Sequence, residues 1–202
     1  MKYLLFSLLT FFAGSISNFA LAPWDYFFVL LFSFPLFFFV LQDIYNEKKI
    51  KNKTLSFILF GNIFLFGYFL FGLLWISSAF NYREGFAELK FISIFGLPFL
   101  LCLITTPGWI LTAFLWGKGL HGCFALSAGI ITGEFLRSYL FSGFPWNLFG
   151  HSIGFNDFSM QVGSIFGFHL SGFFVILFSL APILFLKRST LKWGIIFSLI
   201  LP

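Results

Sequence analysis

Residues 54–80 read TLSFILFGNIFLFGYFLFGLLWISSAF and contain no charged side chain. A helix needs about 20 apolar residues to cross a hydrocarbon core of about 30 Å. This run is long enough to cross with a tilt. It predicts a transmembrane helix, which makes the lipid bilayer the solvent in which the chain folds.

Similar apolar runs occur along the whole chain. Six are long enough to span, and a shorter one follows them: residues 3–22, 26–42, 54–80, 91–116, 119–141 and 162–186, then 191–202. The fourth run contains Pro98 and Pro107, which we expect to kink it or to mark its end. The predicted fold is all-α, a polytopic transmembrane helix bundle with six full spans and a truncated seventh.

The overall composition also indicates a membrane protein. The 202 residues are 59% hydrophobic and 9% charged, include 37 Phe and have a mean hydropathy of +0.98. A soluble domain is about 25% charged. So few charges cannot cover a soluble exterior, and so much apolar surface is incompatible with disorder. A soluble enzyme and a disordered chain are therefore excluded.

Basic residues predict the orientation. The net charge of +5 does not require a nucleic-acid partner, and we predict none. In membrane proteins an excess of basic residues usually lies in the cytoplasmic loops. If the N-terminus is cytoplasmic, nine basic residues lie inside: Lys2, Lys48, Lys49, Lys51, Lys53, Lys118, Lys187, Arg188 and Lys192. Only Arg83 and Lys90 lie outside. Residues 81–90 and 142–161 are then predicted to lie outside, on the side of the membrane away from the cytoplasm.

The first and last runs each allow two interpretations. Residues 3–22 resemble a signal peptide, with Lys2 before the run and Ala20-Leu21-Ala22 as a cleavage site. Pro23 would follow that cut and suits a protease poorly, so we favour a retained helix. Residues 191–202 reach only about 18 Å as a helix. We expect that the sequence is the front part of a longer protein; the alternative is a short interfacial helix.

The fifth run contains a charged pair within the membrane. Glu134 and Arg137 are three residues apart and share one helical face. Two interpretations stay open: a structural ion pair that locks this helix to a neighbour, or groups that line an outward-facing polar cavity. On the same helix, Ala125, Gly129 and Gly133 recur every four residues, as Gly163, Gly167 and Ser171 do in the sixth run. Both patterns predict close helix packing.

The segment SGFPWNLFG at residues 142–150 is too rich in Gly and Pro to continue a helix. Its aromatic residues suit the membrane–water boundary. We favour an interfacial loop over a re-entrant segment at the mouth of a cavity.

Little else in the sequence points to chemistry. Cys102 and Cys123 lie in apolar runs and are predicted to be buried, without metal-ligand or disulfide spacing. His121, His151 and His169 have no second catalytic residue at a suitable spacing, so we expect structural roles rather than that of a base. From spacing alone we predict no catalytic residue, no metal and no cofactor.

Five segments, in order along the chain, resemble apolipoprotein N-acyltransferases. They are FALAPWDY at 19–26, GYFLFGLLW at 67–75, EFLR at 134–137, SGFPWNLFG at 142–150 and SIFG at 164–167. The combination of Glu-Phe-Leu-Arg with Phe-Pro-Trp is the most specific part. Ser138 and Tyr139 depart from the Gly and Trp of the family pattern.

The resemblance implies a multi-pass enzyme of the Gram-negative inner membrane that functions in lipoprotein maturation. Such an enzyme transfers an acyl chain from a phospholipid to the N-terminal diacylglyceryl-Cys amino group of lipoproteins. A periplasmic nitrilase-like domain supplies a Glu–Lys–Cys triad, whose Cys forms a thioester. Neither cysteine here matches that nucleophile, so residues 1–202 are expected to form only the N-terminal transmembrane domain and to be inactive alone.

The same resemblance predicts that five residues form walls of the substrate cavity: Glu134, Arg137, Pro145, Trp146 and Asn147. The alternative function is a small transporter or channel subunit with Glu134 and Arg137 on the path. An inert helical bundle is a third interpretation.

Overall fold

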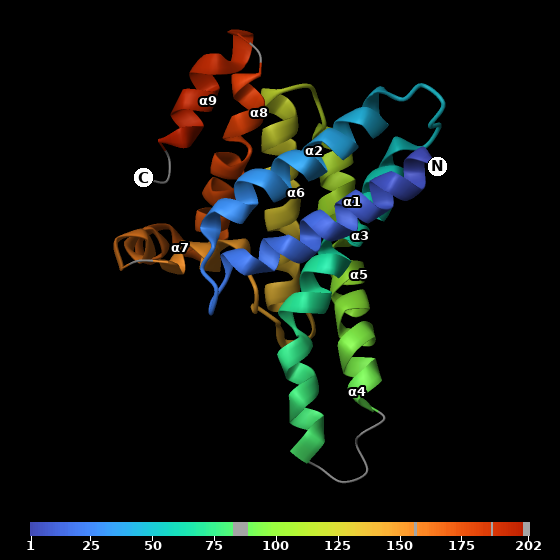
Figure 1. Ribbon diagram of the computed structural model, residues 1–202, viewed down its shortest axis with the longest axis vertical. Coiled ribbons are helices and arrows are strands. Elements are labelled where there is room, and N and C mark those ends of the chain that lie inside the picture. The colour runs from blue at the N-terminus through green and yellow to red at the C-terminus, as the bar shows by residue number, and fades with distance from the viewer. Residues whose placement is uncertain (83–88, 156, 187, 200–202) are drawn as a thin grey trace.

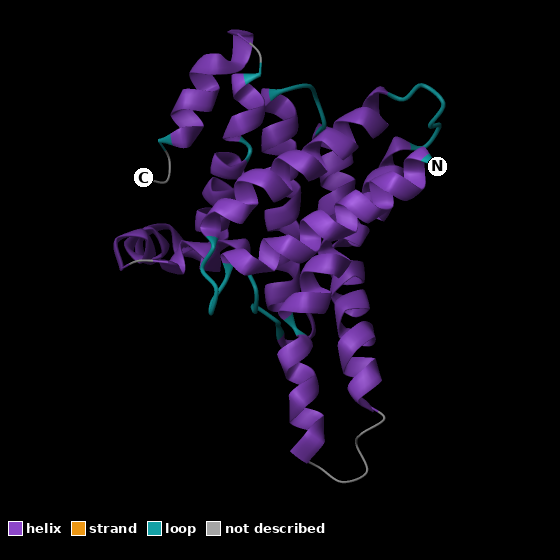
Figure 2. Cartoon of the chain, viewed as in Figure 1, coloured by secondary structure: helices purple, strands orange, loops and turns teal. Residues whose placement is uncertain are grey.

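The computed structural model describes residues 1–82, 89–155, 157–186 and 188–199, which form helices, turns and loops without a β-strand (Figures 1 and 2). The α-helices are α1 (Lys2–Ser17), α2 (Leu30–Asn46), α3 (Lys53–Gly72), α4 (Leu89–Phe91), α5 (Leu97–Leu115), α6 (Leu120–Tyr139), α7 (Asp157–Ser179), α8 (Ala181–Phe185) and α9 (Leu191–Ser198). Short 3₁₀ segments are η1 (Asn18–Ala20), η2 (Phe27–Val29), η3 (Leu74–Tyr82), η5 (Leu140–Ser142), η6 (Phe149–Phe155) and η7 (Arg188–Thr190), and η4 (Ile92–Gly96) is a π-helical turn. The predicted all-α class is confirmed.

Five helical segments of the described chain are long and apolar enough to cross a membrane: Lys2–Ala20, Phe27–Asn46, Lys53–Gly72, Leu89–Leu115 and Met160–Phe185. The predicted total of six full spans is not confirmed. The fifth apolar run forms α6, which is 20 residues long but carries Glu134, Arg137 and several small residues. Because α6 packs against α5, α7 and α2, much of its surface meets protein and does not have to be apolar.

Helix boundaries differ from the apolar runs in several places, and two of them are informative. The run 54–80 forms α3 only as far as Gly72, and the chain continues as the 3₁₀ segment η3. In the run 91–116, the π-helical turn η4 precedes Pro98 at the first turn of α5, whereas Pro107 lies inside α5. Of the last run, α9 and Leu199 are described, and residues 200–202 lie outside the described residues.

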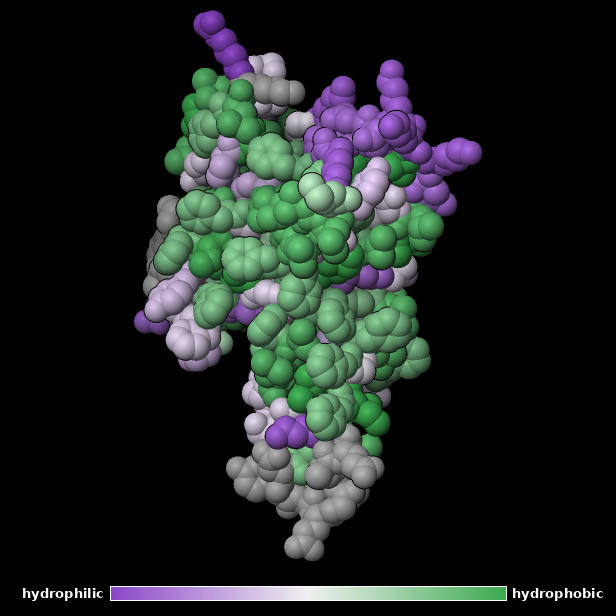
Figure 3. All heavy atoms as spheres, turned by 45° about the vertical axis from the view of Figure 1, so that its right-hand side comes forward, coloured by the Kyte–Doolittle hydropathy of each residue, from purple (hydrophilic) through white to green (hydrophobic). Residues whose placement is uncertain are grey.

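The exterior is apolar around the bundle and basic at one end. Figure 3 shows a broad hydrophobic surface below a hydrophilic cluster at the top right. Large side chains stand far out of the fold, such as Phe114 at 84% exposed and Ile165 at 74% exposed. An apolar surface this extensive, on helices long enough to cross a membrane, indicates contact with lipid.

Close packing of α5 against α6 depends on glycine, as the small-residue pattern predicts. A Cβ at Gly129 would lie 1.7 Å from the Thr112 hydroxyl, and one at Gly133 would lie 2.9 Å from Thr105 Cβ. A Cβ at Gly108 of α5 would lie 2.2 Å from the Gly129 carbonyl oxygen. The close approach predicted from Gly129 and Gly133 is therefore confirmed.

The corresponding prediction for Gly167 is wrong. A Cβ at this position would meet nothing within 4 Å, and the backbone φ of +70° interrupts α7. Figure 1 shows the first part of α7 extending sideways, away from the upright helices. The role of Gly167 is to allow the break in α7, because glycine adopts positive φ at no steric cost.

Candidate functional site

Glu134 and Arg137 lie within the helix bundle. Their residues are 3% and 1% exposed, and Arg137 Nη2 lies 3.8 Å from Glu134 Oε1. The spacing of three residues places both on the same face of α6, as predicted. Burial of one such charge without a partner is costly, so the surroundings of the pair matter.

Arg137 binds the loop that follows α6, residues 143–148. Its Nη1 donates hydrogen bonds to the carbonyl oxygens of Phe144 (2.7 Å) and Trp146 (2.6 Å), and its Nη2 donates to that of Asn147 (2.8 Å). The guanidinium also lies over the Phe69 ring, 5.0 Å from the centroid. These charge-assisted bonds satisfy a non-helical backbone that has no sheet or helix partner.

Glu134 fixes the far end of the same loop. Its Oε1 accepts a hydrogen bond of 2.8 Å from the backbone N–H of Phe149. The pair therefore binds three carbonyl acceptors of the loop and the N–H donor of the residue that follows it. The structure thus uses both side chains to hold the 143–148 loop against the bundle.

Two further helical elements are connected to this loop through Asn147. The Tyr68 hydroxyl of α3 donates to the Asn147 carbonyl at 3.0 Å. Asn147 Nδ2 donates to Asn18 Oδ1 at 3.4 Å, and Asn18 Nδ2 donates to the Tyr68 carbonyl. The loop, the end of α1 and α3 therefore form one polar network.

The chain turns sharply before it enters this loop. Phe141, Ser142 and Gly143 have φ values of 51°, 75° and 81°, and Asn147 has a φ of 53°. Left-handed backbone costs a non-glycine residue about 1–2 kcal/mol. The Arg137 bonds hold the loop in spite of this cost.

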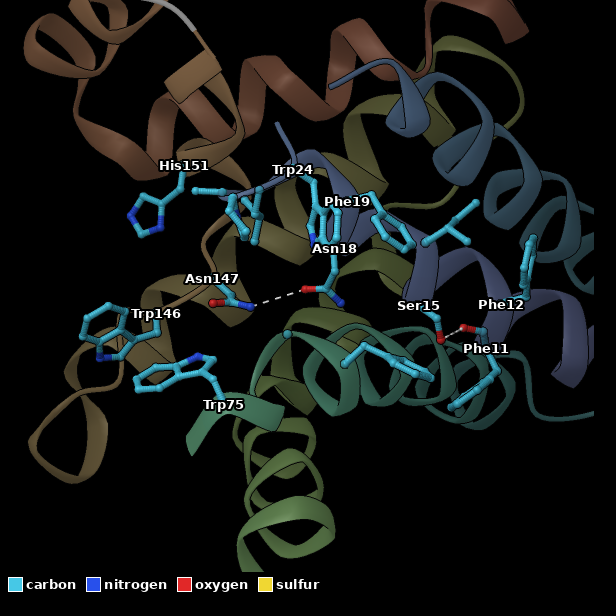
Figure 4. Close-up of a pocket in the computed structure, with 16 residues that line it drawn as sticks. Phe11, Phe12, Ser15, Asn18, Phe19, Trp24, Trp75, Trp146, Asn147 and His151 are labelled. Atoms are coloured by element: carbon cyan, nitrogen blue, oxygen red, sulfur yellow. Dashed lines mark hydrogen bonds between the residues drawn. The ribbon is translucent and has the colours of Figure 1, made fainter. Parts of the chain in front are cut away.

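A cavity of about 810 Å³ lies beside the network. Its volume is within the range of small-molecule sites. The apolar wall is formed mainly by α1 and the end of α3, and Figure 4 shows Phe11, Phe12 and Ser15 at one side. The lining residues are Phe11, Phe12, Ser15, Ile16, Asn18, Phe19, Leu21, Ala22, Pro23, Trp24, Phe71, Gly72, Trp75, Trp146, Asn147 and His151.

The rim of the cavity is aromatic and uncharged. Trp24, Trp75 and Trp146 are 54%, 57% and 55% exposed, and the rings of Trp75 and Trp146 lie 5.7 Å apart. None of the described residues that line the cavity is Asp, Glu, Lys or Arg. The cavity can therefore hold an apolar chain next to neutral polar groups.

His151 contributes a ring nitrogen to this rim. The Leu148 N–H donates to His151 Nδ1 at 3.4 Å, and the ring packs edge-on against Phe168 with centroids 4.8 Å apart. Burial lowers the pKa of His151, and the charges of Arg137 and His169 lower it further. The imidazole is therefore held neutral, with its proton on Nε2.

The structure separates the predicted cavity residues into two groups. Trp146 and Asn147 line the cavity, whereas Glu134 and Arg137 lie behind the loop and do not line it. Pro145 lies in the 143–148 loop next to Trp146 and is exposed. Contact of these five residues with substrate stays a prediction.

Sequence reasoning missed the wall contributed by α1 and α3. Phe11, Phe12 and Phe71 sit in runs that are apolar on every side, so the sequence gives no indication of the face that meets a cavity. Trp24 and Trp75 did lie in segments that resembled the family. That resemblance, in FALAPWDY and GYFLFGLLW, was the available signal.

The remaining candidates lie away from the cavity. Cys102 and Cys123 are free and buried, 4% and 0% exposed, as predicted. His169 Nε2 lies 3.1 Å from the Ser138 hydroxyl, which itself donates to the Glu134 carbonyl. His121 is exposed at the start of α6.

Sequence comparison identifies relatives of the whole folded region. Residues 13–181 match the family "Apolipoprotein N-acyltransferase N-terminal domain". The apolipoprotein N-acyltransferase of Sinorhizobium fredii is 32% identical over 158 residues, 77% of this chain and 30% of the relative. Those of Allorhizobium ampelinum and Rhizobium etli are each 31% identical, over 94% and 96% of this chain and 36% and 37% of theirs.

The chain spans about a third of the length of these curated relatives. The matched region includes the C-terminal end of α1, the network around Arg137 and all of the cavity lining except Phe11 and Phe12. The chain therefore belongs to the apolipoprotein N-acyltransferase family, whose N-terminal domain it matches.

Proposed function

We propose that this chain is the membrane domain of an enzyme that transfers an acyl chain from a phospholipid to the N-terminal diacylglyceryl-Cys amino group of lipoproteins. In this proposal the cavity between α1, α3 and the 143–148 loop receives lipid acyl chains. The observation that carries it is the coincidence of an apolar cavity of about 810 Å³ with the region matched by the family.

The proposed orientation has a cytoplasmic N-terminus and periplasmic residues 142–161, in the inner membrane of a Gram-negative bacterium. The unequal distribution of basic residues supports it. Exposed Lys48, Lys49 and Lys51 lie in the loop between α2 and α3, and Figure 3 shows hydrophilic residues gathered at one end.

We further propose that the acyl-transfer nucleophile is not among residues 1–202. Both cysteines are buried inside helices, whereas a reactive cysteine is partly exposed and lies near positive charge. The transporter alternative receives less support, because Glu134 and Arg137 already bind each other and the backbone of the 143–148 loop.

Photo-cross-linking tests the lipid cavity. The full chain is reconstituted in vesicles that contain a phospholipid with a diazirine in one acyl chain, and cross-linked residues are mapped by mass spectrometry. We expect labelling of Phe11 and Phe71 in the cavity, and also of Phe114, which faces outward. Ser15→Trp should fill the cavity and reduce labelling of Phe11 and Phe71 while Phe114 is unaffected. Equal labelling of all three in both proteins would contradict the proposal.

A further inference from the structure

Several of the polar groups that border the cavity are donors without acceptors. Within the described chain, the indole N–H groups of Trp24, Trp75 and Trp146 have no hydrogen-bond partner. The Leu148 N–H occupies His151 Nδ1, which leaves the Nε2–H of the imidazole as a further donor. A ligand that binds these donors must present acceptor oxygens to them.

The amide groups of the rim are already largely occupied. Asn18 uses its Nδ2 on the Tyr68 carbonyl and its Oδ1 on Asn147 Nδ2. Ser15 donates to the Phe11 carbonyl at 2.8 Å. Each of these amides keeps one further N–H hydrogen, and the donors that are wholly available to a ligand are the three indoles and His151.

Among the residues that the structure describes, the rim also has no cation for an anionic ligand. The guanidinium of Arg137 contacts the loop, but its Nη atoms donate to three backbone carbonyls and the residue is 1% exposed. Placing a phosphate in an apolar cavity without a counter-charge is unfavourable. The acceptor oxygens that fit are therefore neutral carbonyl oxygens.

We propose that the cavity recognises the ester carbonyls of an acylglycerol, with the acyl chains along Phe11, Phe12 and Phe71 and the carbonyl oxygens at His151, Trp75 and Trp146. This inference rests on the proposed function and assigns its cavity a ligand group. Phospholipids and diacylglyceryl-modified proteins share that group. In either case, a headgroup phosphate or a peptide would stay outside the rim.

Two comparisons between lipids test this inference: one pair differs in the ester carbonyls, and the other differs in the phosphate headgroup. The full chain is purified in detergent, and binding of lipids with dibrominated chains is followed by quenching of tryptophan fluorescence. Three ligands with the same chain length are compared: a diacylglycerol, its dialkyl ether analogue, which lacks both carbonyls, and a diacyl phospholipid. One lost hydrogen bond weakens binding by about five-fold.

We expect the diester to bind at least five-fold tighter than the diether, and the diacyl phospholipid to bind within about three-fold of the diacylglycerol. In His151→Phe the preference for ester over ether should fall by about five-fold, and Trp146→Phe, which keeps the ring, should lower it similarly. His151→Gln retains a side-chain N–H and should preserve much of the preference. His121→Phe, at an exposed histidine outside the cavity, should change nothing.

Equal binding of diester and diether by the unaltered chain would overturn the inference. A phospholipid that binds more than ten-fold tighter than the diacylglycerol would overturn it too, because it would indicate a phosphate site. In both cases acyl-chain labelling in the cavity would leave the proposed function standing. Absence of cavity labelling contradicts the proposed function instead. Circular dichroism and thermal unfolding confirm that each variant is folded.

Discussion

Two loops of this protein join helices by opposite physical means. The 47–52 loop, between α2 and α3, exposes three lysines. Its backbone is held by local bonds: Asn52 Oδ1 caps α3 at the Leu55 N–H (2.9 Å), and Lys53 Nζ binds the Ile44 and Glu47 carbonyls. Its one long-range partner in the described chain is Lys2, which pairs with the partly exposed Glu47 side chain. The 143–148 loop is held instead by a buried charge pair and by Tyr68. Water solvates the first loop, whereas the protein has to replace water for the second.

This difference indicates in which loop the stability of the bundle depends on single side chains. A loop that water can solvate tolerates the loss of one partner, because water takes its place. A loop inside the bundle leaves unpaired backbone groups when a partner is removed, and each costs about 1–3 kcal/mol. Substitutions in the two loops should therefore differ sharply in their effects.

Arg137→Met should have the largest effect. It removes three bonds to loop carbonyls and leaves Glu134 as an unpaired buried charge, so we expect a loss of about 3–5 kcal/mol in the free energy of unfolding. Thermal and denaturant unfolding in detergent measure it, with Lys49→Met in the solvated loop as control. Equal midpoints for the two variants would remove the contrast between the loops.

Tyr68→Phe isolates one bond of the network. It removes only the hydroxyl that donates to the Asn147 carbonyl, and the aromatic ring can still stack on Phe149. We expect a loss of about 1 kcal/mol in the free energy of unfolding. Tyr45→Phe, at a partly exposed position of α2, is the matched control and should be neutral; a similar loss there would point to a general effect of the hydroxyl.

The free energy of unfolding should depend on pH through His151. Burial and the nearby charges of Arg137 and His169 lower its folded pKa below the ordinary value of 6.5. As the pH falls, the unfolded chain binds the proton first, so stability is complete above about pH 6.5 and declines below it, down to the folded pKa. Unfolding at pH 7.5 and 5.5 measures this decline. It should be smaller in His151→Gln, and an identical decline in that variant would assign it to other groups.

Lys2→Met should have the smallest effect. Lys2 pairs with Asp43 at 2.6 Å and with Glu47 at 3.4 Å, but these groups are exposed beside the solvated loop. Water and salt screen such a pair, so we expect no measurable change in the unfolding midpoint at 150 mM salt. A loss as large as that of Tyr68→Phe would show that the two ends of the bundle are not as different as proposed.

Much of the fold follows from local sequence. The apolar runs predicted where helices form, and the spacing of Gly129 and Gly133 predicted close packing of α6. The spacing of Glu134 and Arg137 predicted that they share a face. These features depend on periodicity within one helix, which the sequence contains in full.

The cavity could not be predicted in the same way. Phe11 and Phe12 look like any other residues of a lipid-facing helix, and only packing decides which of them meets a cavity. The same four-residue glycine spacing had two different outcomes: Gly129 and Gly133 of α6 pack against α5, whereas Gly167 interrupts α7. The spacing does not indicate which backbone φ the surroundings impose on a glycine.

By itself, the amino-acid sequence determined that this chain folds in lipid as a set of helices, and that it carries a charged pair within one of them. Both follow from hydrophobicity and helical periodicity, which are local. Only the tertiary structure decided that the pair holds a loop, and that α1, α3 and that loop enclose an uncharged cavity. These depend on contacts between segments far apart in the chain, such as Asn18 with Asn147, and no local pattern contains them.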